Sequence, residues 1–114
     1  MGTMNSQVNI RWQKVCASED ILPMLGVRAL IDDRQIAIFR VHTALYAIDA
    51  VDPFSGAAVL SRGIVGDVKG RLVVASPLYK QHFDLETGEC LEDASVSVMT
   101  YAVREIDGAV EIGY

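Results

Sequence analysis

Short runs of β-branched and other aliphatic residues, each ended by a turn sequence, follow one another along the chain and constrain its fold most strongly. No long segment places apolar residues at the helical spacing, whereas several runs alternate as strands with one buried face do. In the last run, Val110 and Ile112 alternate with Glu111 and Gly113. The chain is therefore predicted to be all-β. The expected strands are Ile10–Val15, Gly26–Ile31, Arg34–Val41, Ala44–Ala50, Arg71–Ser76, Phe83–Leu85, Cys90–Glu92, Val96–Ile106 and Ala109–Tyr114.

Turn sequences between these runs predict hairpins. Asp107-Gly108 separates the last two expected strands, and a Gly at that place suits a two-residue turn with positive φ. Asp32-Asp33, Lys69-Gly70 and Thr87-Gly88 separate other runs in a similar way. Consecutive strands are therefore expected to pair in an antiparallel manner.

Two stretches depart from the strand pattern. Ser18–Asp20 is expected to form a short helix, capped by Ser18 and interrupted by Pro23. Asp52–Val68 is long for a connection in a small domain and shows no clear alternation. Long ordered loops usually carry function, so this second stretch is a candidate site.

Length and charge exclude several classes of protein. The chain has 114 residues, which suits one domain over residues 1–114, and residues 1–5 are set apart because Met4 is itself a candidate initiator. The net charge is −5 and no basic cluster occurs, which argues against nucleic acid and against a membrane as partners. No apolar run approaches the roughly 18 residues of a membrane span, and no secretory signal is recognised. A cytoplasmic protein is expected.

The residues that often carry chemistry are few and scattered. Cys16 and Cys90 lie far apart and outside any Cys-x-x-Cys pair, so neither a disulfide nor a metal site is expected on them. His42 and His82 have no nucleophile beside them in the sequence and are interpreted as structural residues. The carboxyl side chains within residues 84–93 alternate across an expected hairpin and are interpreted as a solvated face. The motifs of nucleotide binding, zinc proteases and hydrolase nucleophiles are missing.

Two segments carry the most specific signal, DPFSGA at residues 52–57 and SPLYKQHFDLETG at residues 76–88. Together they resemble the two loops of the Rieske family. In that family, C-x-H followed by a Gly, and later C-P-x-H-x-x-x-F-D-x-x-x-G, hold a [2Fe–2S] cluster through two thiolates and two imidazoles. The resemblance implies a Rieske-like sandwich of short antiparallel strands, with Asp52–Gly66 and Ser76–His82 as two capping loops.

All four ligand positions of the resemblance are changed in this sequence. Asp52 and Ser76 stand at the cysteine positions, and Phe54 and Tyr79 stand at the histidine positions. Phenylalanine has no donor atom and serine would have to ionise its hydroxyl, so no cluster, and no other cofactor or metal, is expected on this chain. Phe54 and Tyr79 are instead expected to be structural and to fill the space that the imidazoles occupy in the family.

A longer pattern resembles a narrower family, the small subunits of the assimilatory NAD(P)H-dependent nitrite reductases. It joins DPF at 52–54, LSRG at 60–63 and SPLYKQ at 76–81 to Trp12, Gly26-Val27 and Glu92-Asp93. The resemblance implies a cluster-free, non-catalytic subunit. Its partner would be a large catalytic subunit that holds FAD, a [4Fe–4S] cluster and sirohaem and reduces nitrite to ammonium with six electrons during nitrate assimilation.

The same resemblance suggests where the partner binds. The tips of the two loops are the expected docking surface, and Arg62 and Lys80 are the strongest candidates because cations beside loop tips steer association with an acidic partner. The partner-binding candidates are Leu60, Ser61, Arg62, Leu78, Lys80 and Gln81.

Other functions remain open from the residues alone. One is a stand-alone electron carrier with an atypical metal site, in which Asp52, Tyr79 and His82 would bind a hard metal. The same three residues would serve a small acid–base enzyme. A generic β-domain interaction module is the remaining alternative.

Overall fold

The computed structural model describes residues 10–114 and confirms the all-β prediction. Residues 1–5, which were set apart above, lie outside the described residues. Two short 3₁₀ turns, η2 (Ser18–Asp20) and η3 (Leu60–Arg62), interrupt the strands of the described part. The strands are β1 (Trp12–Ala17), β2 (Gly26–Ile31), β3 (Arg34–Val41), β4 (Ala44–Asp49), β5 (Ile64–Val68), β6 (Arg71–Ala75), β7 (His82–Asp84), β8 (Thr100–Ile106) and β9 (Ala109–Gly113).

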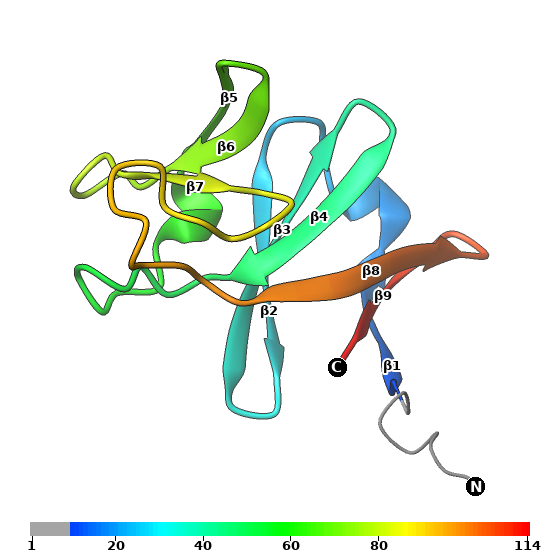
Figure 1. Cartoon of the computed structure of the whole chain (residues 1–114). Coiled ribbons are helices and arrows are strands. Elements are labelled where there is room, and N and C mark those ends of the chain that lie inside the picture. Colours follow the sequence, from blue (N-terminus) through cyan, green and yellow to red (C-terminus); the bar gives the residue numbers. More distant parts are fainter. Residues whose placement is uncertain (1–9) are drawn as a thin grey trace, which may run out of the picture.

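A six-stranded antiparallel sheet has the order β1-β9-β8-β4-β3-β2. The β2–β3 and β3–β4 hairpins turn at Asp32 and His42, which both have positive φ. The predicted Asp107-Gly108 turn is confirmed: it joins β8 to β9, and both residues have positive φ. A second antiparallel sheet, β5-β6-β7, lies beside the first (Figure 1).

β3 runs between two apolar cores. Its residues Ala37, Phe39 and Val41 belong to one core, which includes Phe83 and lies toward the smaller sheet. Ile36 and Ile38 point to the opposite face and belong to the second core. All of these side chains are at most 2% exposed. Because successive side chains of a strand point to opposite faces, the unbroken apolar run of β3 reflects burial on both sides.

The structure corrects three local expectations. Ala17, not Ser18, is the N-cap of η2, and the Ser18 hydroxyl instead bonds with Arg40 and Glu105. β8 begins at Thr100, because residues 96–98 pair with the segment 88–90 through Cys90 N–H to Val96 O and Val98 N–H to Gly88 O. The expected strand at 90–92 is reduced to an isolated bridge between Cys90 and Phe83.

The largest correction is β5, which lies inside the stretch that was expected to be irregular. Val65 is its single buried residue and Gly66 interrupts the alternation, so the sequence pattern hides it. β5 pairs with β6 through the Lys69-Gly70 turn. The predicted capping loop at Asp52–Gly66 therefore ends in an edge strand of the smaller sheet.

The two ends of the molecule differ. Loops 52–59, 76–81 and 85–99 gather at the left in Figure 1, whereas β1 and β9 lie at the right. Arg11 and Tyr114 exchange backbone hydrogen bonds of 3.0 and 3.1 Å, so both ends of the described chain meet far from these loops. Within residues 10–114, there is no helix with the length and apolar character needed to span a bilayer.

Candidate functional site

The loop that begins at Asp52 is closed by its own backbone. The Asp52 N–H donates to Ala57 O at 2.9 Å, and the Gly56 N–H donates to Asp52 O at 2.7 Å. Asp52 Oδ1 accepts the Phe54 N–H at 2.8 Å, which fixes the first turn of the loop. Gly56 has a φ of 75°, a conformation that glycine adopts without steric cost.

The loop that begins at Ser76 repeats this geometry. The Ser76 N–H donates to Gln81 O at 2.9 Å, and the Lys80 N–H donates to Ser76 O at 3.0 Å. The Leu78 N–H approaches Ser76 Oγ at 3.4 Å, and Lys80 takes the positive φ, 66°, that Gly56 has in the first loop. The two segments that resemble cluster-binding loops therefore share one backbone form.

A third loop of the same form begins at Asp84, and the sequence analysis missed it. The Asp84 N–H donates to Glu89 O, the Gly88 N–H donates to Asp84 O, and Gly88 has a φ of 81°. Asp84 Oδ1 accepts the N–H of Glu86 at 2.7 Å. The available signal was an Asp followed four residues later by a Gly, which the first and third loops share.

A buried hydrogen bond joins the first two loops at the former cysteine positions. The Ser76 hydroxyl donates to Asp52 Oδ2 at 2.5 Å. Asp52 is 0% exposed and Ser76 is 1% exposed. Both oxygens of the Asp52 carboxyl group thus have partners, as a buried polar group requires. Contact between these two side chains holds the loops together directly.

The aromatic residues at the former histidine positions do not fill a void, so that expectation was wrong. Tyr79 is 59% exposed and Phe54 is 38% exposed. The Phe54 ring lies beside the buried Phe83 ring, with centroids 6.2 Å apart and planes inclined by 45°. The closed contact between Asp52 and Ser76 leaves the two rings at the surface, where they are available to a partner.

The chemistry of these four positions does not suit a [2Fe–2S] cluster. A Rieske centre needs two thiolates and two imidazoles, and this site offers a carboxyl group, a hydroxyl, a phenyl ring and an exposed phenol. Cys16 and Cys90 lie on β1 and beside β7, outside both loops. Burial raises the pKa of both thiols, which keeps them protonated near neutral pH.

The three residues proposed for a hard metal or for acid–base work have different surroundings: Asp52 is buried and bonded to Ser76, whereas Tyr79 is 59% exposed. Between residues 10 and 114, no group of three His, Cys, Asp or Glu side chains is arranged to hold a metal ion. His82 Nδ1 instead lies 2.6 Å from Glu92 Oε2, and the His82 N–H donates to Glu92 Oε1 at 2.7 Å. Burial raises the pKa of the Glu92 carboxyl group, but the bonds from His82 lower it more, so the net pKa is below its ordinary value.

The third loop is held by an ion-pair network. Arg71 Nε donates to Asp84 Oδ2 and Arg71 Nη2 donates to Glu89 Oε1, both at 2.8 Å. Burial raises the pKa of the Asp84 carboxyl group, but the Thr87 N–H, the Arg71 guanidinium and the Glu86 N–H lower it more. The pKa of Asp84 therefore lies below its ordinary value of 3.8.

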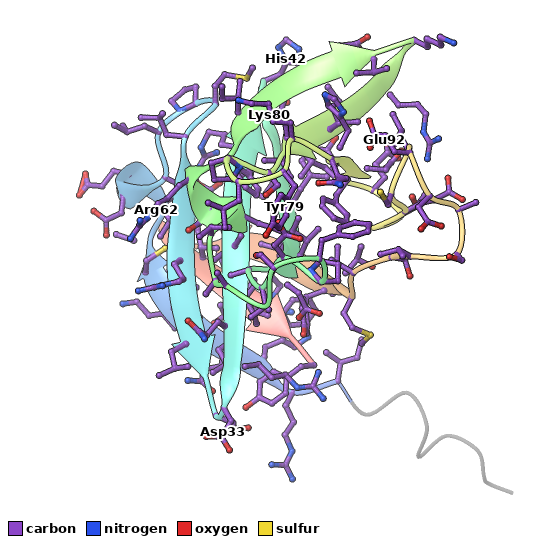
Figure 2. The ribbon with its side chains drawn as sticks, turned by 90° about the vertical axis from the view of Figure 1, so that its left-hand side faces the viewer. Asp33, His42, Arg62, Tyr79, Lys80 and Glu92 are labelled. Atoms are coloured by element: carbon purple, nitrogen blue, oxygen red, sulfur yellow. The ribbon has the colours of Figure 1, made fainter. Side chains whose placement is uncertain are left out.

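The predicted partner-binding residues divide by exposure. Leu60 is 0% exposed within the first core, so the structure corrects its interpretation as a contact residue. Ser61 and Gln81 are half-buried, and the Gln81 Oε1 has no hydrogen-bond partner within the described residues. Arg62, Leu78 and Lys80 are exposed. Figure 2 views the loop end and shows Arg62 and Lys80 around Tyr79, with Asp33 at a distant hairpin tip.

Comparison with known proteins identifies the family. Residues 11–113 match the Rieske-like [2Fe-2S] domain family. The chain is 46% identical over 104 residues to the nitrite reductase (NADH) small subunit of Escherichia coli K12. The aligned segment covers 90% of this chain and 96% of that protein. The chain belongs to the nitrite reductase small-subunit family. The Salmonella typhimurium small subunit is 47% identical over the same shares of the two chains.

Solved structures of this small-subunit family have the same fold. The NADH-dependent nitrite reductase small subunit from Mycobacterium tuberculosis superposes with a TM-score of 0.88 at 45% identity, covering 92% of this chain and 96% of that chain. The ferredoxin of carbazole 1,9a-dioxygenase from Nocardioides aromaticivorans superposes with a TM-score of 0.77 at 20% identity, over 89% of this chain and 95% of that one. At that identity, the ferredoxin shows a shared fold alone.

One further relative carries the small-subunit sequence inside a longer chain. The nitrite reductase [NAD(P)H] large subunit of Klebsiella oxytoca is 39% identical over 102 residues, which are 90% of this chain and 11% of that protein. In that relative, a segment like this chain is covalently part of the large subunit.

Proposed function

We propose that this chain is the non-catalytic small subunit of an NAD(P)H-dependent nitrite reductase, and that it binds a large catalytic subunit. The observation that carries the proposal is the match to small subunits across nearly the whole of both chains. The Klebsiella relative supports the identity of the partner, because there the same segment is joined to the large subunit. FAD, the [4Fe–4S] cluster and sirohaem are assigned to that partner, where nitrite is reduced to ammonium for nitrate assimilation.

The chemistry of the loops supports a binding role for this chain. Asp52 and Ser76 satisfy each other in a buried contact, so neither is directed at a substrate. Arg62 and Lys80 are exposed at the same end (Figure 2), and Leu78 is exposed in the loop that carries Lys80. These three residues are proposed to contact the large subunit. The cytoplasm is proposed as the compartment, where a partner that oxidises NAD(P)H has access to this cofactor.

The test is a pull-down of the tagged chain from its own source grown on nitrate, followed by a visible spectrum of the eluate. We expect a large subunit with flavin and sirohaem absorption, together with nitrite-dependent oxidation of NAD(P)H. A mock purification from cells with an untagged chain is the control.

Two outcomes contradict the proposal. A colourless eluate without a large partner favours an independent interaction module. A brown chain that elutes alone indicates a stand-alone electron carrier and overturns the ligand argument, because iron–sulfur clusters absorb in the visible range.

A further inference from the structure

Exposed apolar side chains gather around the loop end, and the sequence analysis named only Leu78 among them as a partner contact. Leu25 is 59% exposed, Ile64 76%, Leu78 51% and Tyr79 59%. With the cations Arg62 and Lys80, they form a set that we call the docking face: Leu25, Arg62, Ile64, Leu78, Tyr79 and Lys80. Single exposed apolar residues are ordinary, whereas a group of them with a polar rim is typical of a protein interface.

The segments that carry these residues lie side by side. A Cβ built on Gly26 would stand 2.2 Å from Ser61 O, so the segment containing Leu25 runs against η3 and Arg62. A Cβ on Gly63 would stand 2.4 Å from Ala75 O, and Ile64 pairs with Ala75 in the sheet. Ser76 follows directly and begins the loop that carries Leu78, Tyr79 and Lys80.

The docking face is built on fixed backbone. Arg40 Nε donates to Ile21 O at 3.0 Å, and the Met24 N–H donates to Arg40 O at 2.8 Å, which anchors the segment before Leu25 to β3. The bond from Ser76 to Asp52 anchors the other side. A preorganised surface loses little conformational entropy when a partner binds.

The charge of the docking face is opposite to that of the chain. The whole chain has a net charge of −5, yet its segments 21–25, 53–66 and 76–83 contain no Asp or Glu. Asp52 beside them is 0% exposed. Glu92, which Figure 2 shows to the right of Lys80, is bonded to His82. The two charged side chains of the docking face itself, Arg62 and Lys80, are therefore both cations.

We propose that the docking face binds an apolar patch of the large subunit that is bordered by carboxylates facing Arg62 and Lys80. This inference rests on the proposed function and adds the surface, three further contact residues (Leu25, Ile64 and Tyr79) and the chemistry of the partner's patch. A second copy of the chain is a poorer occupant, because an isologous contact would bring the cations of two copies together.

The apolar part is tested with Leu25→Ser/Leu78→Ser, measured by titration calorimetry against the purified large subunit of the same organism. Both leucines are more than half exposed, so the fold is retained. We expect Kd to rise about tenfold or more, because both substitutions lose apolar area that the partner would remove from water. Leu30→Ser is the matched control, since Leu30 is 68% exposed on β2 near the distant Asp33 tip, and it is expected to change Kd by less than about twofold.

The charged part is tested with Arg62→Glu/Lys80→Glu in stopped-flow association. We expect the association rate to fall about tenfold or more at low salt and the difference to shrink as salt screens the charges. Lys14→Glu/Arg28→Glu makes the same change in net charge on exposed positions of β1 and β2 and is the control.

The outcomes separate this inference from the proposed function. If the wild-type chain binds the large subunit and both docking-face variants bind it equally well, the inference alone is overturned. The same holds if the control variants lose as much binding as the docking-face variants do. A wild-type chain that does not bind the large subunit overturns both. Sedimentation that shows a wild-type dimer dissociated by Leu25→Ser/Leu78→Ser makes a second copy the occupant and also overturns the inference.

Discussion

At the scale of single residues, Ser76 and Asp52 form the contact on which the loop end depends. The hydroxyl and the carboxyl group are both excluded from water, and each has the other as a partner. Loss of one member leaves the other buried with an unsatisfied atom, which costs more than an exposed hydrogen bond contributes. The contact therefore stabilises the chain mainly through the penalty for breaking it.

We predict that Ser76→Ala lowers the free energy of unfolding by about 1–3 kcal/mol, because the buried Asp52 oxygen then lacks a donor. Urea denaturation followed by circular dichroism measures the change. Ser95→Ala, in which an exposed hydroxyl is removed, is the control and should cost less than about 0.5 kcal/mol. Equal stability of Ser76→Ala and the wild type would contradict the prediction.

A second residue-scale prediction concerns pH. The lowered pKa of Asp84 means that its stabilising contribution is present above the ordinary carboxyl pKa and is lost as pH falls through the folded-state value. Asp84→Asn removes the ion pair with Arg71, so we expect a loss of about 1.5–3 kcal/mol at pH 7 that diminishes below about pH 4. Urea unfolding at several pH values measures the difference in the free energy of unfolding between Asp84→Asn and the wild type. A difference that stays constant down to pH 2 would refute the prediction.

The sequence predicted the positions of residues within the two loops better than it predicted their burial. The sequence analysis placed Asp52, Phe54, Ser76 and Tyr79 at corresponding points of two loops, and the structure gives those loops one backbone form. It could not predict that Leu60 is buried whereas Leu78 is half exposed, because both leucines lie in irregular segments without alternation. Nor could it show that Phe54 and Tyr79 face outward, since this follows from the contact between two distant side chains.

At the scale of elements, the repeated six-residue loop explains the positions of the glycines. The fifth residue of each loop has positive φ, and Gly56 and Gly88 occupy it in the first and third loops. The surroundings differ: nothing lies within 4 Å of a Cβ built on Gly56, whereas one on Gly88 would stand 2.0 Å from Val98 O. The third loop is thus packed against the 96–98 segment and the first loop is open.

This difference predicts unequal costs for the same substitution. Gly56→Ala is expected to cost about 1–2 kcal/mol, the penalty of a left-handed conformation for a residue with a Cβ. Gly88→Ala incurs that penalty and also displaces the backbone at Val98, for about 1–3 kcal/mol more. Thermal or urea unfolding of both variants gives the comparison, and similar losses would show that the contact with Val98 O relaxes freely.

Strands with regular patterns were predicted best. The bounds of β2 and β3 agree with the expected runs because apolar content and turn residues coincide there. β5 was missed because its single buried residue sits among two glycines and exposed positions. The start of β8 was misplaced because residues 96–99 have an apolar pattern like that of a strand. Val96 and Val98 instead bond to the segment of the third loop, and residues 96–99 do not pair with β9.

At the scale of the whole molecule, the ends of the described chain meet at Arg11 and Tyr114, while the docking face occupies the far end (Figure 1). A linker attached at either point leaves that face uncovered. Within a longer polypeptide, such a linker turns association into an intramolecular event with an effective concentration of order millimolar for short flexible connections. A copy that is separate from the large subunit obtains its occupancy from affinity alone, whereas a copy tethered within a longer chain, as the matching Klebsiella oxytoca segment is, needs only a much weaker contact to fill the same site.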